Sequence, residues 1–241
     1  SYGQKIFESK VENFVAIGDE LLAFTEDGKR GMINSSGEYI LRPRYDAIAA
    51  NKENMVSVLR NRKFGLYDEV NEVFIPTNYD KNLRKYNNQY YIAESEGRKV
   101  VIDHDNEQLS NDSFEEVVFW NDTSALVKND FLWYLYDLNS GTLSEQGIKS
   151  ISFIRESSEE LVAVILVDNS YGVWSSTRGE VIAPTFNDIV NVGTENNHVY
   201  FTEKHIEEAE FYVVIYYNEN GELIFKSATE AEDYGMIYCD N

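Results

Sequence analysis

The residues of this chain that could carry chemistry are mainly carboxylates, since 42 of the 241 residues are Asp or Glu. Carboxylates act as general acids and bases and as oxygen ligands for calcium. Residues 103–107 and 137–141 place oxygen ligands at alternate positions, as calcium loops do. Neither segment has the distal Glu of an EF-hand, and both coincide with hairpin turns, which need Asp, Asn and Gly for backbone reasons. The spacing therefore favours turns over calcium sites.

The other residue types that support catalysis are few and scattered. His104, His198 and His205 lack the spacing of a zinc site, and His198 and His205, which could meet across one hairpin, have no third ligand. Cys239 is a lone thiol, interpreted as a small apolar residue of a strand. No nucleophile elbow, phosphate loop or dinucleotide fingerprint occurs. We therefore predict that the protein is not an enzyme and has no catalytic residues, no cofactor and no metal site.

The charge balance favours one kind of partner. With 42 acidic residues against 21 Lys and Arg, the net charge is -21, and it is spread over most of the loops. Such a field repels the phosphates of nucleic acids and anionic lipids, and it attracts basic protein surfaces. The same charge also keeps a strand-rich chain soluble. We therefore expect no nucleic-acid binding, and a protein partner with a basic surface.

Membrane insertion is not expected, because no hydrophobic run approaches the roughly 18 residues that a spanning helix needs. No signal peptide is visible. The chain begins with Ser1 rather than Met, which slightly favours an exported protein, periplasmic or on the cell surface, whose leader has been removed.

The elements that must position any site come from a repeat. A short β-rich segment recurs six times at intervals of 34 to 37 residues, which indicates an array of similar units. The six copies begin near residues 21, 55, 90, 124, 161 and 198. Partial units are expected at 1–17 and at 235–241, where residues 235–238 resemble the start of a seventh copy. We therefore predict a single repeat domain over residues 1–241.

Each copy contains four short strand candidates. The second run opens with an aromatic or basic residue and often Gly, and a turn of Asn, Asp, Ser and Gly leads into the third run. The chain has only three prolines, and all three fall at the end of a third run, where a missing N–H does not break a ladder. An aromatic and a polar residue follow each of Pro43, Pro76 and Pro184, namely Tyr45-Asp46, Tyr79-Asp80 and Phe186-Asn187.

This pattern resembles the WG-repeat family, also called KWG, whose unit reads aromatic-Gly-hydrophobic-hydrophobic-Asp, a turn Gly, and then hydrophobic-Pro-x-x-Tyr-Asp. The matching segments are 64–68 with 75–80, 30–34 with 43–46, and 171–174 with 184–187. The signature Trp never precedes the Gly, and the third, fourth and sixth copies lack that Gly. The resemblance implies a bacterial interaction or envelope-associated repeat protein with no common activity, so it indicates a fold and not a function.

Four short strands per unit of about 35 residues fit a small propeller blade. We therefore predict an all-β repeat protein that forms a closed β-propeller of six or seven small blades, with an open β-solenoid of about 35-residue repeats as the alternative. The incomplete units at both ends favour the ring, because strands from the two termini could complete one blade and leave no free sheet edge.

Two features of the sequence are candidates for binding. Residues 203–210 form a strongly acidic segment where other copies have a short turn, and one helical turn is expected there. Its Glu207, Glu208 and Glu210 are candidate binding residues. Trp120, beside a predicted loop, is the candidate surface anchor among the aromatic residues, although the interior of a repeat is an alternative place for it.

These features favour a non-enzymatic protein-binding scaffold that presents an acidic loop surface to a partner. A carbohydrate-binding module that uses Trp120 and the loop tyrosines is one alternative. An immunity or inhibitor protein, whose negative charge neutralises a basic effector, is another. Binding that weakens with salt would favour the first and third, and binding that survives high salt would favour the second.

Overall fold

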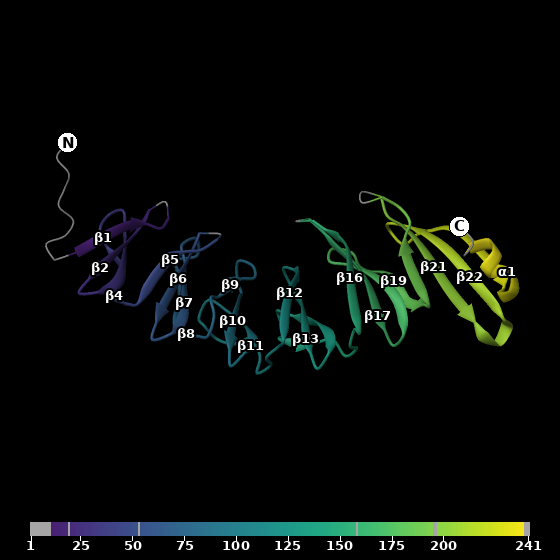
Figure 1. The fold of residues 1–241 in the computed structure, drawn as a ribbon, viewed down its shortest axis with the longest axis horizontal. Helices are drawn as coiled ribbons and strands as arrows, with labels where there is room; N and C mark the ends of the chain where they lie inside the picture. Colours follow the sequence, from purple (N-terminus) through teal and green to yellow (C-terminus); the bar gives the residue numbers. More distant parts are fainter. Residues whose placement is uncertain (1–10, 19, 53, 158, 195–196, 239–241) are drawn as a thin grey trace. The chain divides into compact units, whose positions relative to one another are not determined.

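The computed structural model describes residues 11–18, 20–52, 54–157, 159–194 and 197–238 (Figure 1). In these residues the chain forms six antiparallel sheets, which we number 1 to 6 in chain order. Five sheets have four strands and sheet 3 has three, and in every sheet the strands follow one another as in the sequence. The predicted all-β repeat fold is confirmed, and six sheets agree with the expected number of units.

Contacts within the chain divide it into two compact units, residues 1–117 and 118–241, whereas the sequence predicts a single domain. The first unit contains sheets 1 to 3. Sheet 1 consists of β1 (Val11–Ala16), β2 (Leu21–Glu26), β3 (Lys29–Asn34) and β4 (Tyr39–Tyr45). Sheet 2 consists of β5 (Ala47–Ala50), β6 (Met55–Arg60), β7 (Lys63–Asp68) and β8 (Val73–Tyr79). Sheet 3 consists of β9 (Arg84–Lys85), β10 (Tyr91–Ser95) and β11 (Arg98–Ile102).

The second unit contains sheets 4 to 6, and its boundary falls inside β12. Sheet 4 consists of β12 (Glu116–Asn121), β13 (Ser124–Asn129), β14 (Leu132–Asp137) and β15 (Thr142–Leu143). Sheet 5 consists of β16 (Ser150–Glu156), β17 (Leu161–Val167), β18 (Ser170–Ser175) and β19 (Gly179–Phe186). Sheet 6 consists of β20 (Asp188–Asn191), β21 (Val199–Ile206), β22 (Phe211–Asn218) and β23 (Leu223–Glu230). A 3-10 turn, η1 (Glu207–Ala209), and a helix, α1 (Ala231–Tyr238), complete the second unit.

The sheets are out of phase with the sequence repeats. The final stretch of each of copies 1 to 5 leaves its own sheet and becomes the first strand of the next one, as β5 does when it pairs with β6. β1 is the corresponding strand of sheet 1, and it lies in the partial unit that the sequence predicts at 1–17. Residues 1–10 of that predicted partial unit lie outside the described residues. Neighbouring sheets in a unit are thus tied by the chain as well as by packing.

The Gly of the repeat motif faces a bulge that contains the proline. In β7–β8, Phe64 pairs with Tyr79 and Leu66 with Ile75, so three residues of β8 lie opposite Gly65 alone. A Cβ at Gly65 would lie 2.5 Å from the carbonyl oxygen of Ile75. The hairpins at Gly31 and Gly172 have the same register shift. The Gly and the proline therefore act together, because the proline lies in the bulge and the Gly leaves room for the bulged backbone.

Copies that lack the Gly have a different strand pairing at this position. In sheet 6, Val213 pairs with Ala228 in a ladder that runs without a shift through this position. In sheets 3 and 4 the third run is largely replaced by longer segments, which return through the isolated bridges Lys99–Phe114 and Trp133–Ile148. This is why sheet 3 has three strands where the repeat predicts four.

The residues after the proline connect neighbouring sheets. The aromatic residue is buried in each copy that has it, with Tyr45 at 1% and Phe186 at 7% exposure. The following Asp46 accepts hydrogen bonds from Lys29 Nζ and from the backbone N–H of Asn61, both at 2.7 Å. Asp46 therefore joins β3 of sheet 1 to the β6–β7 turn of sheet 2, and the hydrogen bond from Lys29 lowers its pKa.

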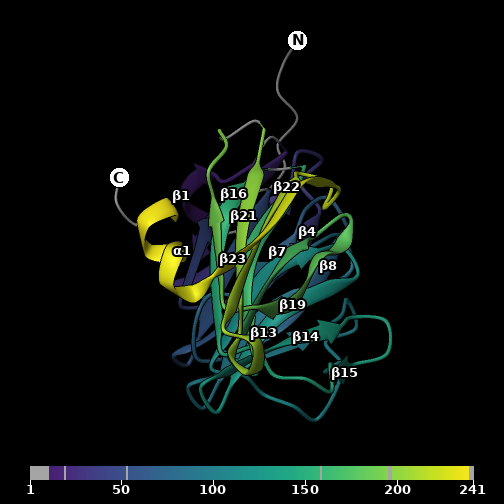
Figure 2. The same ribbon diagram turned by 90° about the vertical axis from the view of Figure 1, so that its right-hand side faces the viewer.

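The residues 235–238 that resemble a seventh copy are not a strand, so this prediction is wrong. They form the second half of α1, whose Tyr234 is 7% exposed and stacks on Tyr212 of β22 at 4.1 Å. Tyr238 packs on Phe201 of β21, so α1 lies against part of the face of sheet 6 that points away from the cluster shared with sheet 5 (Figure 2). Helix-forming Ala231 and Glu232 start the helix before the apolar run, and acidic residues in its first turn suit the helix dipole. Cys239 lies outside the described residues.

Within the described ranges, no helix combines the length and apolar character that crossing a membrane requires.

Candidate functional site

A pocket of about 210 Å³ lies in the second unit, where the ends of sheets 4 and 5 meet. Residues 119–122, at the end of β12, form one wall. Residues 157 and 159–161, in the β16–β17 turn and the start of β17, form another, and residues 176 and 177 after β18 complete it. We call it the Trp120 pocket, after the tryptophan that lines it.

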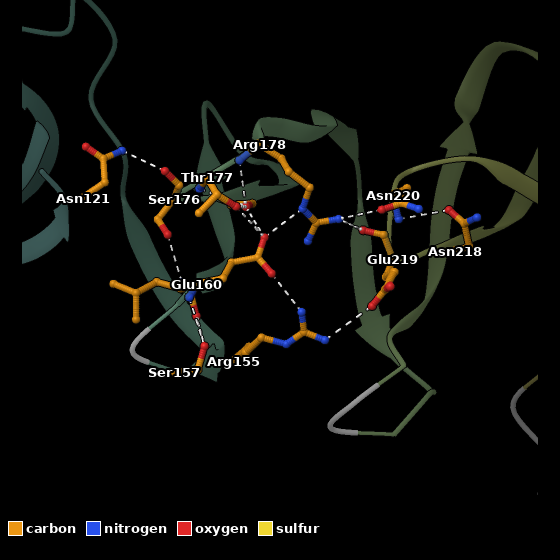
Figure 3. Close-up of polar contacts among 12 residues, drawn as sticks. Asn121, Arg155, Ser157, Glu160, Ser176, Thr177, Arg178, Asn218, Glu219 and Asn220 are labelled. Carbon is orange, nitrogen blue, oxygen red and sulfur yellow. Dashed lines mark hydrogen bonds and ion pairs between the residues drawn. The ribbon is translucent and has the colours of Figure 1, made fainter. Parts of the chain in front are cut away.

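Hydrogen bonds hold these chain segments together. The Asn121 side-chain amide donates to the carbonyl oxygen of Ser176 at 2.8 Å, which joins sheet 4 to sheet 5 (Figure 3). The Ser176 hydroxyl accepts from the backbone N–H of Leu161 at 2.9 Å. Ser157 caps its own turn, since its hydroxyl donates to the Glu160 carbonyl and accepts from the Glu160 N–H. The pocket is therefore built on sheet ends whose backbones are fixed.

Glu160 is the most heavily bonded carboxylate of the site. Its Oε1 accepts hydrogen bonds from Arg178 Nε at 2.8 Å, Thr177 Oγ1 at 3.0 Å and the Ser175 hydroxyl. Its Oε2 accepts from Arg155 Nη1 at 2.8 Å (Figure 3). Burial acts to raise the pKa of Glu160, but the hydrogen bonds from Ser175, the two arginines and Thr177 outweigh it and lower the pKa to about 2. Glu160 is therefore ionised, and both of its carboxylate oxygens already accept hydrogen bonds from side chains of this chain.

The two arginines extend this network to sheet 6. Arg155 Nη2 lies 3.4 Å from a carboxylate oxygen of Glu219, and Arg178 Nη1 donates to the Glu219 carbonyl and to Asn220 Oδ1. Glu219 and Asn220 belong to the β22–β23 turn. The network thus bridges the ends of sheets 5 and 6 beside the Trp120 pocket.

A buried histidine lies close to the arginines. His198 is fully buried, and its Nδ1 lies 2.9 Å from the Asn191 side-chain amide. Burial and the positive charge of Arg155 lower the pKa of His198, so the ring is neutral. His198 Nε2 and the Tyr200 hydroxyl have no hydrogen-bond partner among the described residues. His198 is therefore a core residue of sheet 6. It directly precedes β21, whereas His205 lies near the other end of that strand and stacks on Tyr212 at 4.4 Å, so the two histidines do not form a ligand pair.

Trp120 is buried, whereas a surface anchor would be exposed. Its side chain is 4% exposed and packs with Phe153 and with the apolar cluster shared by sheets 4 and 5. It lines the Trp120 pocket on one side and a second, mainly apolar pocket of about 160 Å³ that also contacts Leu135 and Trp174. Trp120 is therefore a wall of the candidate site, and a ligand can reach it only from within a pocket.

The acidic candidates Glu207, Glu208 and Glu210 are all exposed and lie together at the β21–β22 turn. The expected helical turn is η1, which contains the first two, and Glu210 ends it with a φ of 53°. The strands extend further than predicted, since Ile206 pairs with Phe211 and only residues 207–210 form the loop. These glutamates do not line the Trp120 pocket, so the sequence candidates fall at two separate places.

Several residues of the site were not found by sequence reasoning. Glu160, Arg155 and Arg178 come from separate turns, and no local spacing reveals that they meet. Phe119, which lines the Trp120 pocket and is 44% exposed, is not among the residues that the sequence predicts for binding. Its position next to Trp120 and ahead of Asn121 and Asp122 was the available signal.

The two segments with calcium-like spacing are turns in the structure. Asp103 Oδ1 accepts from the backbone N–H groups of residues 105 and 107, and Asp137 Oδ1 from those of residues 139 and 140. The same capping occurs at the matching position of the other copies, at Asn34, Asp68, Ser175 and Asn218. The described part of the chain contains no group of three or more His, Cys, Asp or Glu arranged to hold a metal ion.

Six small meanders repeated along one chain define an all-β repeat protein, a class that commonly serves as an interaction scaffold. Residues 31–64 match the family model described as WG containing repeat, and this match supports assignment to the WG-repeat family. The matched segment runs from the Gly of the first copy to the aromatic residue before the Gly of the second, which is one full period.

Comparisons with other proteins add little to this assignment. No curated protein matches the chain significantly. Similar solved structures include Hsv2p of Kluyveromyces lactis, with 9% identity over 92% of this chain and 99% of that chain, at a TM-score of 0.32. A eukaryotic initiation factor has 14% identity over 87% of this chain and 64% of that chain, at 0.38. The CNH domain of AfRom2 has 10% identity over 91% and 85%, at 0.32. At these TM-scores the likenesses carry no argument about fold or function.

Proposed function

We propose that this protein is a non-enzymatic scaffold that binds a protein partner through an acidic surface, and that the partner presents basic residues. The repeat β-fold favours an interaction scaffold, and the charge determines which surfaces it attracts.

The observation that carries the proposal is the excess of carboxylates. Even if each of the 21 Lys and Arg paired with one of the 42 acidic residues, 21 carboxylates would be left without a cation. Isolated carboxylates are strongly disfavoured in a protein interior, so they must lie at the surface. A surface of this kind accelerates association with basic proteins and repels acidic ones.

Part of this excess is concentrated at one turn. Glu207, Glu208 and Glu210 are exposed within four residues, and no basic residue follows in the last turn of η1. Like charges at such short spacing repel each other, and a basic partner relieves that repulsion. This turn is therefore the first place to test.

A pull-down of the immobilised protein from a lysate of its source cell, at about 50 and about 500 mM salt, tests the proposal. We expect retained proteins that are basic, that bind at low salt and that are lost at high salt. A Glu207→Gln, Glu208→Gln, Glu210→Gln variant should retain less of them. Retention that is unaffected by salt, or no retained protein at all, would contradict the scaffold function.

The carbohydrate alternative now depends on Phe119, because Trp120 presents no open face for stacking. A sugar bound at Phe119 would stay bound at high salt and be lost on Phe119→Ala, so the same salt series separates the two readings.

A further inference from the structure

We propose that the Trp120 pocket receives one Lys or Arg side chain of the protein partner. This inference rests on the proposed function and names a place where a basic partner is recognised by shape as well as by charge.

The size of the pocket favours a single side chain. At about 210 Å³ it is smaller than the roughly 300–1,000 Å³ of sites that enclose a drug-sized ligand. It is too small for an oligosaccharide or a cofactor to be enclosed, and it is large enough for one long, unbranched side chain. A long side chain can enter it end-on from a partner that lies over the ends of sheets 4 and 5.

The lining of the pocket matches a basic side chain along its length. Trp120 and Leu161 provide apolar surface, and Phe119, which is 44% exposed, adds an aromatic ring. The methylene groups of Lys or Arg pack on such surface, and the charged head group is attracted by an aromatic face. The pocket therefore offers apolar surface to the methylene groups of the side chain and an aromatic ring to its charged head group.

The carboxylates of the pocket define where the head group goes. Asp122, Glu159 and Glu160 line it, and no Lys, Arg or His occurs among its described lining residues. Glu160 is already bound by Arg155 and Arg178, so it cannot take a further cation without losing one of them. Asp122 and Glu159 are exposed and lie on different walls of the pocket, so a cation that arrives from outside meets these two carboxylates first.

The walls are held in place before binding. The Asn121–Ser176 hydrogen bond joins a wall from sheet 4 to a wall from sheet 5, and Ser157 caps the turn that carries Glu159 (Figure 3). A pre-formed site loses less entropy on binding than a loop that must first be ordered. This distinguishes the Trp120 pocket from the exposed glutamates of residues 207–210, which offer charge alone.

The test is a titration of the full chain, labelled with ¹⁵N, with a capped pentapeptide that has one central lysine between glycines and serines. An arginine version and a norleucine version, which keeps the stem and removes the charge, are titrated in parallel at low salt. We expect the lysine and arginine peptides to shift the signals of the Trp120 indole N–H and of the Asp122 and Thr177 amides. We expect the norleucine peptide to leave these signals in place.

Two variants with the same change in net charge separate the pocket from the overall field. Asp122→Asn with Glu159→Gln should weaken the affinity about fivefold, because both head-group partners are lost. Asp105→Asn with Glu107→Gln removes two exposed carboxylates in the first unit, and should change the affinity by less than about twofold. Thermal unfolding of both variants checks that each is folded.

Each other outcome overturns the inference in a recognisable way. If both variants weaken binding equally, or if the shifts spread over the whole surface, the peptide is attracted by net charge alone, and the scaffold function stands without the pocket. If cellotetraose shifts the pocket signals at about 500 mM salt and the lysine peptide does not, the pocket binds a glycan. If neither basic peptide nor any basic protein binds at low salt, the inference and the proposed function fail together.

Discussion

Glu160 shows how one residue can hold several elements in place. Its side chain is 15% exposed and accepts hydrogen bonds from two arginines and two hydroxyls, which come from β16, β18 and the turn after β18. Removing the charge would leave Arg155 and Arg178, which are 20% and 30% exposed, with a poorer partner. The carboxylate therefore stabilises the ends of sheets 5 and 6 only while it is ionised.

The pH dependence of this contribution has a definite sign. The pKa of Glu160 is about 2 in the folded protein and 4.5 ordinarily, so its stabilisation is present above pH 4.5 and is lost as the pH falls toward 2. Glu160→Gln should lower the free energy of unfolding by about 2–3 kcal/mol at pH 7. Urea denaturation at pH 7, 5 and 3 should show this difference shrinking below pH 4.5.

Glu159→Gln is the matched control, because its carboxylate is exposed, and the free energy of unfolding should change by less than about 0.5 kcal/mol. A deficit of Glu160→Gln that is the same at pH 7 and pH 3 would show that side-chain shape, and not charge, causes it.

Phe131 is a residue whose place the hairpin itself does not explain. It is the second residue of a two-residue turn, with a φ of 70°, and its side chain is 86% exposed. Gly28 and Gly97 occupy this position in two other hairpins, as the positive φ favours. A bulky residue there costs about 1 kcal/mol, and an exposed ring recovers none of it by packing. The repeat pattern predicts the turn and gives no reason for the Phe.

The β-hairpin with its bulge is the element that the sequence describes best. The Gly, the proline and the buried aromatic residue occur together in copies 1, 2 and 5, and each has a separate backbone or packing role in the structure. In copy 6, which lacks both the Gly and the proline, the ladder runs without a register shift at the equivalent position. The motif therefore predicts one local backbone geometry, the bulge opposite the Gly.

Gly65→Ala tests that geometry. The added Cβ would lie 2.5 Å from the Ile75 carbonyl oxygen and 2.9 Å from backbone atoms of residues 76 and 77, so the bulge must move. We expect a loss of about 1–3 kcal/mol in the free energy of unfolding, measured by chemical denaturation. Gly235→Ala is the control, because a Cβ there meets nothing within 4 Å and Ala favours the helix. Equal stability of Gly65→Ala and the unchanged chain would show that the bulge can move at little cost in free energy.

Elements whose form depends on distant contacts were predicted less well. The apolar residues 235–238 have the composition of a first run, yet they lie in α1 because Tyr234 and Tyr238 cover the aromatic face of sheet 6. The Trp120 pocket is formed at the ends of two sheets, by three segments that lie between residues 119 and 177. Period and turn chemistry are local signals, so they predict strands and hairpins but neither the helix that covers a sheet nor the residues that meet at sheet ends.

At the scale of the whole molecule, charge acts on stability and on binding in opposite directions. A net charge of -21 destabilises the folded chain by self-repulsion, while the same charge attracts a basic partner. Salt screens both effects, because the screening length falls from about 30 Å at 0.01 M to about 4 Å at 0.5 M. Ion pairs that are buried, such as Lys85–Asp68 at 2.9 Å with 10% and 0% exposure, are screened much less.

We therefore expect the unfolding temperature, measured by calorimetry, to rise by several degrees when NaCl increases from about 0.01 to about 0.5 M. Binding of the lysine pentapeptide should weaken over the same range. If the unfolding temperature falls instead, exposed ion pairs contribute more to stability than the repulsion among the carboxylates that have no cation. The surplus carboxylates would then lie too far apart to repel one another strongly, and the dense acidic surface that the proposed function requires would be missing.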